Sequence, residues 1–246
     1  MNQRLIRESV GAQDASGKVV QMMSAFSTDN LLPPALRAAG CTLRDGVLLR
    51  GGAALTAEEL CLPEGITELG SACFQGCEAL RSLSLPESLR RIGPSALRGC
   101  TGLTGLRLPE GLEGIGPAAF QGSGLRGLIL PGTLRWIGVS AFADCRALTE
   151  VRLPGGMTRL GKCLFSGCGA LSSADVPAGV SSIGEWAFRG CVSLRRLSLP
   201  DTVTEICAEA FLGCEALTIE AAPASFAASF AERFGLPLAP PAQTDG

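Results

Sequence analysis

Hydrophobic and polar positions along the chain repeat with a period of about 23 residues. The unit from Leu125 to Cys145 shows the pattern: an apolar run that ends in Leu-Pro, a second apolar pair, a glycine and an Ala-Phe pair. The proline after the apolar run marks each unit, at positions 63, 86, 109, 131, 154, 177, 200 and 223. The intervals are 23 residues, apart from one of 22 between Pro109 and Pro131. A repeat of this length indicates a solenoid, in which each coil buries its apolar side against the next.

Each unit predicts two short extended segments and a turn. The L-x-x-L-x-L run, as in Leu103, Leu106 and Leu108, favours a strand whose last two leucines point into the core. The following proline ends this strand, because proline has no N–H to donate. The second apolar pair, such as Leu134 and Ile137, predicts another extended segment that faces back across the coil. The glycine after it is expected to permit the bend into a helical or 3-10 turn.

Two positions of the turn carry the same residue type in almost every unit. Phenylalanine fills one of them, which predicts a stacked aromatic spine at 74, 120, 142, 165, 188 and 211, with Leu97 as the substitute. Cysteine fills the other, at 77, 100, 145, 168, 191 and 214, with Ser123 in its place in the short unit. We expect reduced thiols, because side chains of a stacked position project side by side and a small one there turns toward the backbone of the turn.

The ends of the chain depart from the repeat. At the N-terminal end, Pro34 favours a short helix, and Asp45-Gly46 between two apolar runs is a strong hairpin signal. We therefore expect a flexible or weakly helical lead (1–40), an N-terminal hairpin cap (41–56), the leucine-rich repeat array (57–222), a C-terminal helical cap (223–236) and a disordered tail (237–246).

The C-terminal cap is predicted from the spacing of three aromatic residues. Phe226, Phe230 and Phe234 recur every four residues on a segment that Ser225 can cap and Gly235 can terminate. Their apolar stripe is expected to seal the last coil.

The units L-P-x-x-[VL]-x-x-I-G-x-x-A-F-x-G-C-x-x-L-x-x-L resemble the BspA-like leucine-rich repeats of gut and oral bacteria and of some parasites. The resemblance covers about Asp45 to Phe234, including DGVL at its start and SFAASFAERFGLPL, which is similar to that family's closing cap. It implies a leucine-rich-repeat solenoid of the α/β, horseshoe-like class with short parallel strands. For exported members of the family it also implies adhesion and binding of host proteins.

Charge and hydropathy narrow the expected partners and location. The formal net charge is -2 and the isoelectric point is near 5.4, without a clustered basic face, so nucleic acid is not an expected partner. The first thirty residues hold no apolar run typical of a secretory signal, and no stretch approaches the about 18 apolar residues of a membrane span. As written, the chain is expected to be cytoplasmic and not inserted in a membrane. If it is N-terminally incomplete, the cell surface or secretion is the alternative.

Residue types that usually perform catalysis are scarce. The chain has no histidine and no tyrosine, and its lysines are Lys18 and Lys162, so the common general bases and activated nucleophiles are missing. Tetrahedral zinc needs ligands that converge from different directions, which a stacked cysteine position does not offer. We expect no enzyme, no cofactor and no metal site.

The candidate binding residues are outward positions of the strands, which vary between units while the core does not. Arginine recurs among them and favours bidentate contacts with carboxylates, which suits an acidic protein partner; a glycan is a second candidate. Two tryptophans on outward positions are candidate anchors. The candidate residues are Arg81, Arg107, Arg126, Ile129, Glu150, Arg152, Arg195, Arg196, Trp136 and Trp186.

These features predict a non-catalytic protein-binding or ligand-binding repeat scaffold that uses its exposed sheet face. The alternative is a structural or self-associating surface module, adhesion-like if the chain is part of an exported protein.

Overall fold

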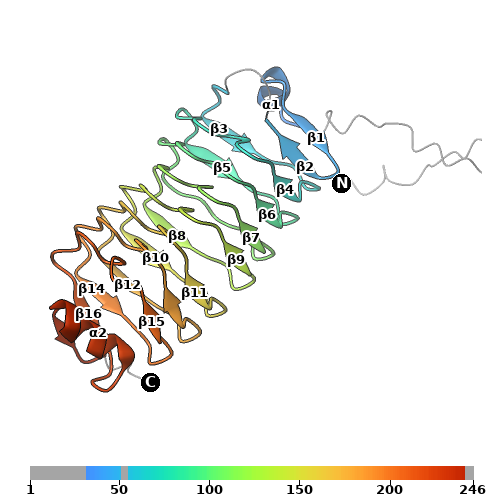
Figure 1. The fold of residues 1–246 in the computed structure, drawn as a ribbon. Coiled ribbons are helices and arrows are strands. Elements are labelled where there is room, and N and C mark those ends of the chain that lie inside the picture. The colour runs from blue at the N-terminus through green and yellow to red at the C-terminus, as the bar shows by residue number, and fades with distance from the viewer. Residues whose placement is uncertain (1–31, 51–54, 242–246) are drawn as a thin grey trace, which may run out of the picture.

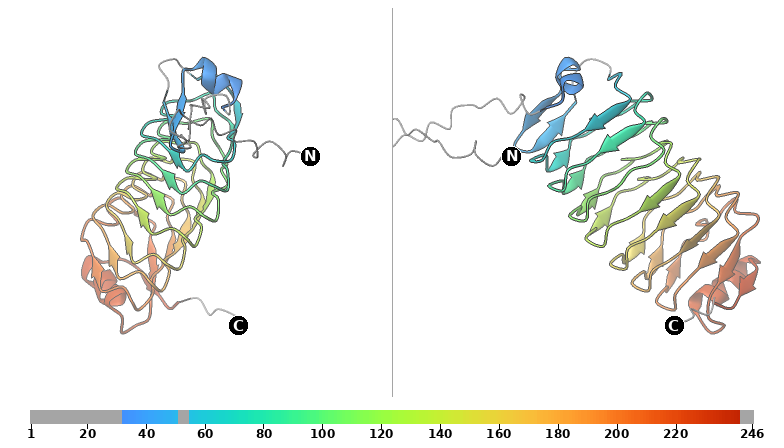
Figure 2. Two further views of the ribbon diagram at one scale, coloured as in Figure 1. Left: turned by 90° about the vertical axis from the view of Figure 1, so that its right-hand side faces the viewer. Right: turned by 180° about the vertical axis from the view of Figure 1, so that it is seen from behind.

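The computed structural model describes residues 32–50 and 55–241 and shows an elongated stack of coils (Figure 1). Each coil contributes to rows of short strands along the stack (Figure 2). The first row contains β3 (Glu59–Cys61), β5 (Ser82–Ser84), β8 (Gly127–Ile129), β10 (Glu150–Arg152), β12 (Ser173–Asp175), β14 (Arg196–Ser198) and β16 (Thr218–Glu220). The second row contains β4 (Glu68–Leu69), β6 (Arg91–Ile92), β7 (Gly114–Ile115), β9 (Trp136–Ile137), β11 (Arg159–Leu160), β13 (Ser182–Ile183) and β15 (Glu205–Ile206). The predicted leucine-rich-repeat solenoid is confirmed.

The core lies between the two rows. The middle residue of the first-row strands is buried, as in Leu83 and Leu128, while its neighbours on the strand face outward. In the second row the last residue is buried, as in Leu69 and Ile92, except for Ile137 of β9, which is half-buried. Because successive residues of a strand point to opposite faces, each short strand needs one inward residue to hold its coil on the core.

The aromatic spine is present from Phe120 onward. The ring centroids of Phe120 and Phe142 lie 5.3 Å apart with an interplanar angle of 11°, and the stack continues to Phe211. Offset stacking of this kind contributes about 0.5–1.5 kcal/mol per pair beyond the burial of area. Leu97, which is fully buried, fills the same position in the coil between Phe74 and Phe120. The spine therefore carries the stacking from coil to coil.

The segment that carries each phenylalanine of the spine forms hydrogen-bonded turns. It does not form a helix in any of the described coils. Successive N–H groups of this segment donate alternately to carbonyls of their own coil and of the next coil. Gln75 and Cys77 donate within their own coil, to the carbonyls of Ala72 and Phe74, whereas Phe74 N donates to Ala96 O of the next coil at 2.7 Å. The turns thus form a third line of hydrogen bonds between coils, beside the two strand rows.

The glycine after each second-row strand serves close packing instead of the expected bend. Neither Gly70 nor Gly93 has a left-handed φ. A Cβ atom on Gly93 would lie 2.6 Å from Leu69 O, and one on Gly70 would lie 2.7 Å from Leu48 O. The preceding coil approaches too closely for a side chain, which is why glycine recurs there.

The N-terminal end is closed as the hairpin signal predicts. A short helix, α1 (Pro34–Ala38), precedes β1 (Thr42–Arg44) and β2 (Val47–Leu49), which pair in antiparallel fashion. Asp45 and Gly46 have φ values of 51° and 80°, the left-handed pair that a two-residue hairpin turn requires. β2 then pairs in parallel with β4 and so covers the edge of the second row.

At the C-terminal end, α2 (Phe226–Phe234) packs on the last coil, but its buried face differs from the expected stripe. Ser225 accepts a hydrogen bond from Ala228 N, and Phe230 meets Phe211 edge-on at 6.0 Å. Phe226 and Phe234 are each 44% exposed. Residues four apart are rotated by about 40° around a helix, so a stripe at every fourth residue turns away from a flat contact. Only its central ring seals the coil.

The beginning of the expected tail is ordered. Leu238–Ala239 forms β17, which pairs in parallel with β16 and extends the first row by one strand. The expectation of disorder from residue 237 was wrong at these positions, because the strand can complete hydrogen bonds of β16. The rest of the predicted tail beyond 241, and the lead before 32, lie outside the described residues.

Candidate binding face on the first strand row

The first row is interrupted in the coil before β8. Residues 104–108, which the leucine pattern predicts as a strand, form none, and β3–β5 and β8–β10 are separate sheets. The one repeat interval of 22 residues, from Pro109 to Pro131, contains β8. This unit is one residue shorter than the others between its turn and its strand. Gly124 N reaches back to Cys100 O at 3.1 Å, and Arg126 N donates to Thr104 O. We attribute the lost pairing to this shortened approach, which brings β8 out of step with the preceding coil.

A hollow of about 390 Å³ lies at the interruption. Its lining combines apolar and charged side chains from three successive coils: Leu106, Arg107, Leu108, Glu110, Gly127, Leu128, Ile129, Pro131 and Glu150. Three of the candidate residues, Arg107, Ile129 and Glu150, are therefore brought together. The size falls within the range of about 300–1,000 Å³ typical of ligand sites.

Ile129 is the most exposed large apolar side chain of this face, at 65%. It lies opposite Arg152 in the register of β8 and β10, and Glu150 lies opposite Gly127. A Cβ atom on Gly127 would be 3.3 Å from a carboxylate oxygen of Glu150, so that side chain extends across the glycine. The centre of the face is thus an apolar residue flanked by one base and one acid.

Ion pairing divides the arginines of this face into two groups. Arg81 pairs with Glu58 at 3.3 Å and Arg107 with Glu87 at 3.8 Å, while Arg196 contacts both Asp175 and Glu220 at 3.2 Å. The second group, Arg126, Arg152 and Arg195, has no ion pair within the described ranges and is exposed.

This grouping leaves only part of the predicted arginine stripe available to a partner. Exposed pairs such as that of Arg107 contribute about 0–1 kcal/mol and can be exchanged for a partner's carboxylate. Arg196 is half-buried between two acids and is held in place by them. Arg152, opposite Ile129, and Arg126, just before β8, are the bases that an acidic partner could reach without breaking an existing ion pair.

The two tryptophans lie away from this face and differ from each other. Trp136 is on β9 in the second row and is 46% exposed. Trp186 is in a turn, half-buried, with Lys162 Nζ 4.9 Å from its ring centroid, and its Nε1 donates to Glu209. Trp186 stays a candidate anchor, but its ring packs against charged neighbours and is less available than that of Trp136.

The cysteine position has the structural role expected of it. Each Sγ from Cys100 onward donates to the carbonyl of the phenylalanine 26 residues or so before it; Cys168, for example, contacts Phe142 O at 3.1 Å. Ser123 hydrogen-bonds Cys145 Sγ at 3.3 Å and so maintains the line. All cysteines in the described residues are free thiols, and no group of three or more His, Cys, Asp or Glu side chains there is placed to hold a metal ion.

Burial keeps the thiols of Cys100 and Cys145 protonated. It raises the pKa of Cys145 to about 11 and that of Cys100 to about 12, from 9.0 for an ordinary thiol. A buried thiol in this state is a poor nucleophile, because the thiolate is the reactive form. Cys214 at the end of the ladder differs, because a hydrogen bond with Cys191 lowers its pKa. At Cys100 and Cys145 the ladder therefore supports the turns.

Comparison with known proteins agrees with this architecture. The model of the BspA type leucine rich repeat region, present in six copies, matches residues 54–148 and 113–228. The chain belongs to the BspA-type leucine-rich-repeat family. No curated protein matches it significantly. Neither helix in the described part of this BspA-type protein is long and apolar enough to cross a bilayer.

Solved structures of bacterial leucine-rich-repeat proteins resemble this BspA-type chain. A leucine-rich repeat protein from Bacteroides ovatus is 25% identical, with a TM-score of 0.53, over 67% of this chain and 55% of that one. The T. pallidum leucine rich repeat protein is 26% identical, with a TM-score of 0.52, over 66% of this chain and 89% of that one. The chain thus spans little more than half of the B. ovatus protein.

Two features of the face were missed by the sequence patterns. Leu106 and Pro131 were assigned to the core and the strand end, and both line the hollow. The signal that could have located them is the single 22-residue interval, since a one-residue change is enough to break strand register.

Proposed function

We propose that this BspA-type protein is a non-catalytic scaffold that binds an acidic protein partner on the outer face of the first strand row. Membership in a leucine-rich-repeat family, whose members typically mediate protein interactions, supports the general role. The exposed Ile129 at the rim of the hollow, opposite Arg152, is the observation that supports this surface; Arg152 and the nearby Arg126 have no ion pair among the described residues. A partner would place an apolar side chain in the hollow and carboxylates on the two arginines.

A charge-reversal experiment tests the proposal. A triple variant, Arg107→Glu, Arg126→Glu and Arg152→Glu, should lose at least 90% of the partner recovered in a pull-down, because the surface then repels carboxylates. The matched control is Arg44→Glu, Arg98→Glu and Arg146→Glu, an equal charge change on exposed residues outside this face. Equal recovery by wild type and the first variant would refute the surface, and a glycan as the recovered partner would refute a protein ligand.

Self-association is the second candidate, and one end of the molecule favours it. Leu212, Phe234 and Leu238 are 55%, 44% and 45% exposed at the C-terminal end, where β17 is the outermost strand of its sheet among the described residues. Sedimentation at several concentrations separates the two functions. Self-association predicts that the measured mass doubles at high concentration without added partner. It also predicts that the variant Leu212→Glu keeps the monomer mass.

A further inference from the structure

The second strand row opens between β9 and β11. Elsewhere in this row the glycine after each strand donates to the preceding coil: Gly138 N to Ile115 O and Gly184 N to Leu160 O, both at 2.8 Å. Within the described residues the equivalent bond from Gly161 N to Ile137 O does not form, and β9 and β11 belong to different sheets. Two backbone groups that the repeat normally pairs are therefore available at this site.

The separation is local. A Cβ atom on Gly161 would lie 4.0 Å from Ile137 O, whereas the equivalent distance at Gly93 is 2.6 Å. The same two coils remain joined through the turn, where Phe142 N donates to Leu164 O at 3.1 Å, and through the β8–β10 pair. The opening is thus a wedge in one row of an otherwise continuous stack.

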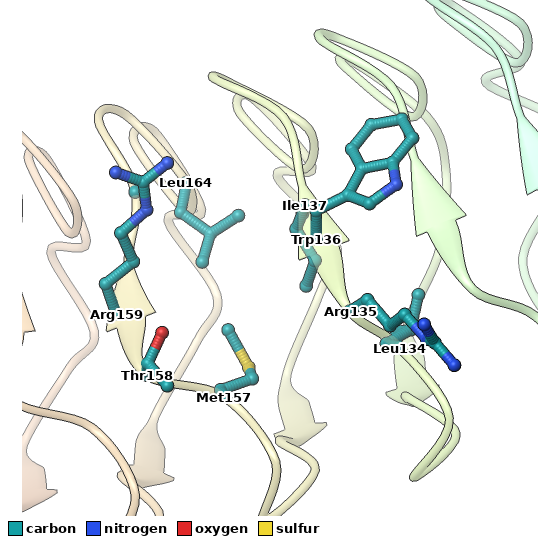
Figure 3. A pocket seen from close by; sticks show the side chains of 9 residues that line it. Leu134, Arg135, Trp136, Ile137, Met157, Thr158, Arg159 and Leu164 are labelled. Carbon is teal, nitrogen blue, oxygen red and sulfur yellow. The ribbon is translucent and has the colours of Figure 1, made fainter.

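A cavity of about 100 Å³ occupies the opening, with apolar side chains such as Leu134, Met157 and Leu164 among those lining it (Figure 3). Figure 3 also shows Trp136 and Arg159 on opposite sides of it. Each unpaired backbone group inside would lose about 1–3 kcal/mol if it were left without a partner. Gly161 and Ile137 are half-buried, so polar groups of a ligand can reach their unpaired backbone groups.

A groove of about 760 Å³ continues from the opening across β9, β11 and β13. Its charged side chains balance: Arg159 and Lys162 are matched by Glu185 and Glu205. Lys162 and Glu185 form an ion pair at 2.6 Å, which leaves Arg159 without a described ion-pair partner. A neutral ligand with many hydroxyl groups suits such a lining, because each hydroxyl can both donate and accept.

Trp136 supplies an apolar surface at one side of this groove. It leans over Gly114, where an added Cβ atom would come within 2.3 to 2.5 Å of three indole atoms. The absent side chain at Gly114 is what lets the indole lie down on the strand row, and nearly half of it stays exposed. Tryptophan combines an apolar ring with a polar N–H, which suits a ligand that is apolar on one face and polar at its edges.

We propose that this groove binds a neutral oligosaccharide of two or three sugars. The C–H face of one sugar stacks on Trp136, and hydroxyls of the next meet Arg159, the Gly161 N–H and the Ile137 carbonyl. Peptides are the less suitable occupant, because the charged side chains of the groove are balanced and Lys162 already pairs with Glu185. This site lies in a different strand row from the proposed protein-binding face and does not depend on it.

Titration with defined trisaccharides tests the proposal, with maltotriose, cellotriose, mannotriose and triacetylchitotriose as probes. The protein carries Trp186→Phe, so that tryptophan fluorescence reports on Trp136 alone. At least one probe should bind and change this fluorescence. Calorimetry should then show at least tenfold weaker binding in Trp136→Ala and at least fivefold weaker binding in Arg159→Ala.

Gly114→Ala provides a variant that keeps the indole but displaces it, and it should also weaken binding at least fivefold. Arg98→Ala, on a turn, is the control and should bind as the parent does. Thermal unfolding shows whether each variant is folded. The proposal is overturned if none of the probes binds, if binding is unchanged by Trp136→Ala, or if acidic peptides bind in a manner that needs Arg159 but not Trp136. Retained sugar binding in the triple arginine variant separates this site from the first-row face.

Discussion

At the scale of single residues, the cysteine ladder has the largest influence on how the protein responds to its surroundings. From Cys100 onward the thiols of the ladder donate to a backbone carbonyl of the preceding coil, and burial raises the pKa of Cys100 and Cys145. The chain has no tyrosine and no histidine, and its lysines are Lys18 and Lys162. Cysteine is thus the main side chain that titrates just above neutral pH.

Stability should consequently fall as the pH rises above 9. In the unfolded chain the thiol loses its proton near 9.0, but in the folded protein Cys145 keeps it to about 11. The folded state binds more protons over this interval, so the stabilisation present below pH 9 is lost progressively up to about pH 11. Thermal unfolding under reducing conditions at pH 8, 9 and 10 should show a falling Tm.

The double variant Cys100→Ala and Cys145→Ala serves as the comparison. It should unfold at a lower temperature than wild type at pH 8, with a smaller decrease between pH 8 and 10. A Tm in wild type that stays constant over this range would contradict the assignment.

At the scale of elements, the strand missing from the first row lies beside the one short unit of the array, while the row also breaks between β10 and β12 in units of regular length. The regular turn reads Gly99-Cys100-Thr101-Gly102-Leu103, and the short one reads Gly122-Ser123-Gly124-Leu125. The strand lost at 104–108 lies immediately before this short approach. A shift of one residue moves every residue of a strand out of register with its neighbour. The hydrogen bonds of residues 104–108 to the row are therefore lost together.

Inserting threonine between Ser123 and Gly124 restores the 23-residue unit and should restore the strand. The amides of Gly105 and Arg107 would then exchange with deuterium at least tenfold more slowly, because they gain partners in the row. The same insertion between Gly155 and Gly156, both exposed, lengthens a regular unit and is the control. Unchanged exchange in the restored unit would show that the interruption has another cause.

At the scale of the whole molecule, each coil contacts only its neighbours, so the two ends determine where unfolding begins. The β1–β2 hairpin covers the second row at one end, and α2 covers the last coil at the other. The central ring of α2, Phe230, continues the aromatic stack onto Phe211. Loss of this contact exposes the end of the core.

Phe230→Ala should therefore release the C-terminal end first. Removing a buried phenylalanine ring costs about 3–5 kcal/mol. Hydrogen exchange should lose protection in β16, β17 and α2, while β8 and β10 keep theirs. Phe226→Ala removes the same group from an exposed position on the same helix and should leave exchange in β16 nearly unchanged. Equal loss of protection in all coils would contradict the prediction that α2 stabilises only the C-terminal end.

Much of this structure could be predicted from the sequence, because its features repeat in register. The leucine and phenylalanine positions determine which side of each coil is buried, Asp45-Gly46 determines the hairpin, and the cysteine position determines the ladder. Each of these depends on residue type and local spacing, and stacking repeats the same contact from coil to coil. The family resemblance rests on the same positions and was confirmed with them.

The proposed binding surfaces depend on contacts between residues about 23 positions apart, which no local pattern contains. Charge pairing between neighbouring coils involves Arg196 and no described partner of Arg152, and Trp186 packs against Lys162 while Gly114 lets Trp136 lie exposed. The sequence by itself determined the periodic core, since burial follows the repeat. Only the tertiary structure decided where the stack opens and which side chains remain available, because both depend on the spacing between whole coils.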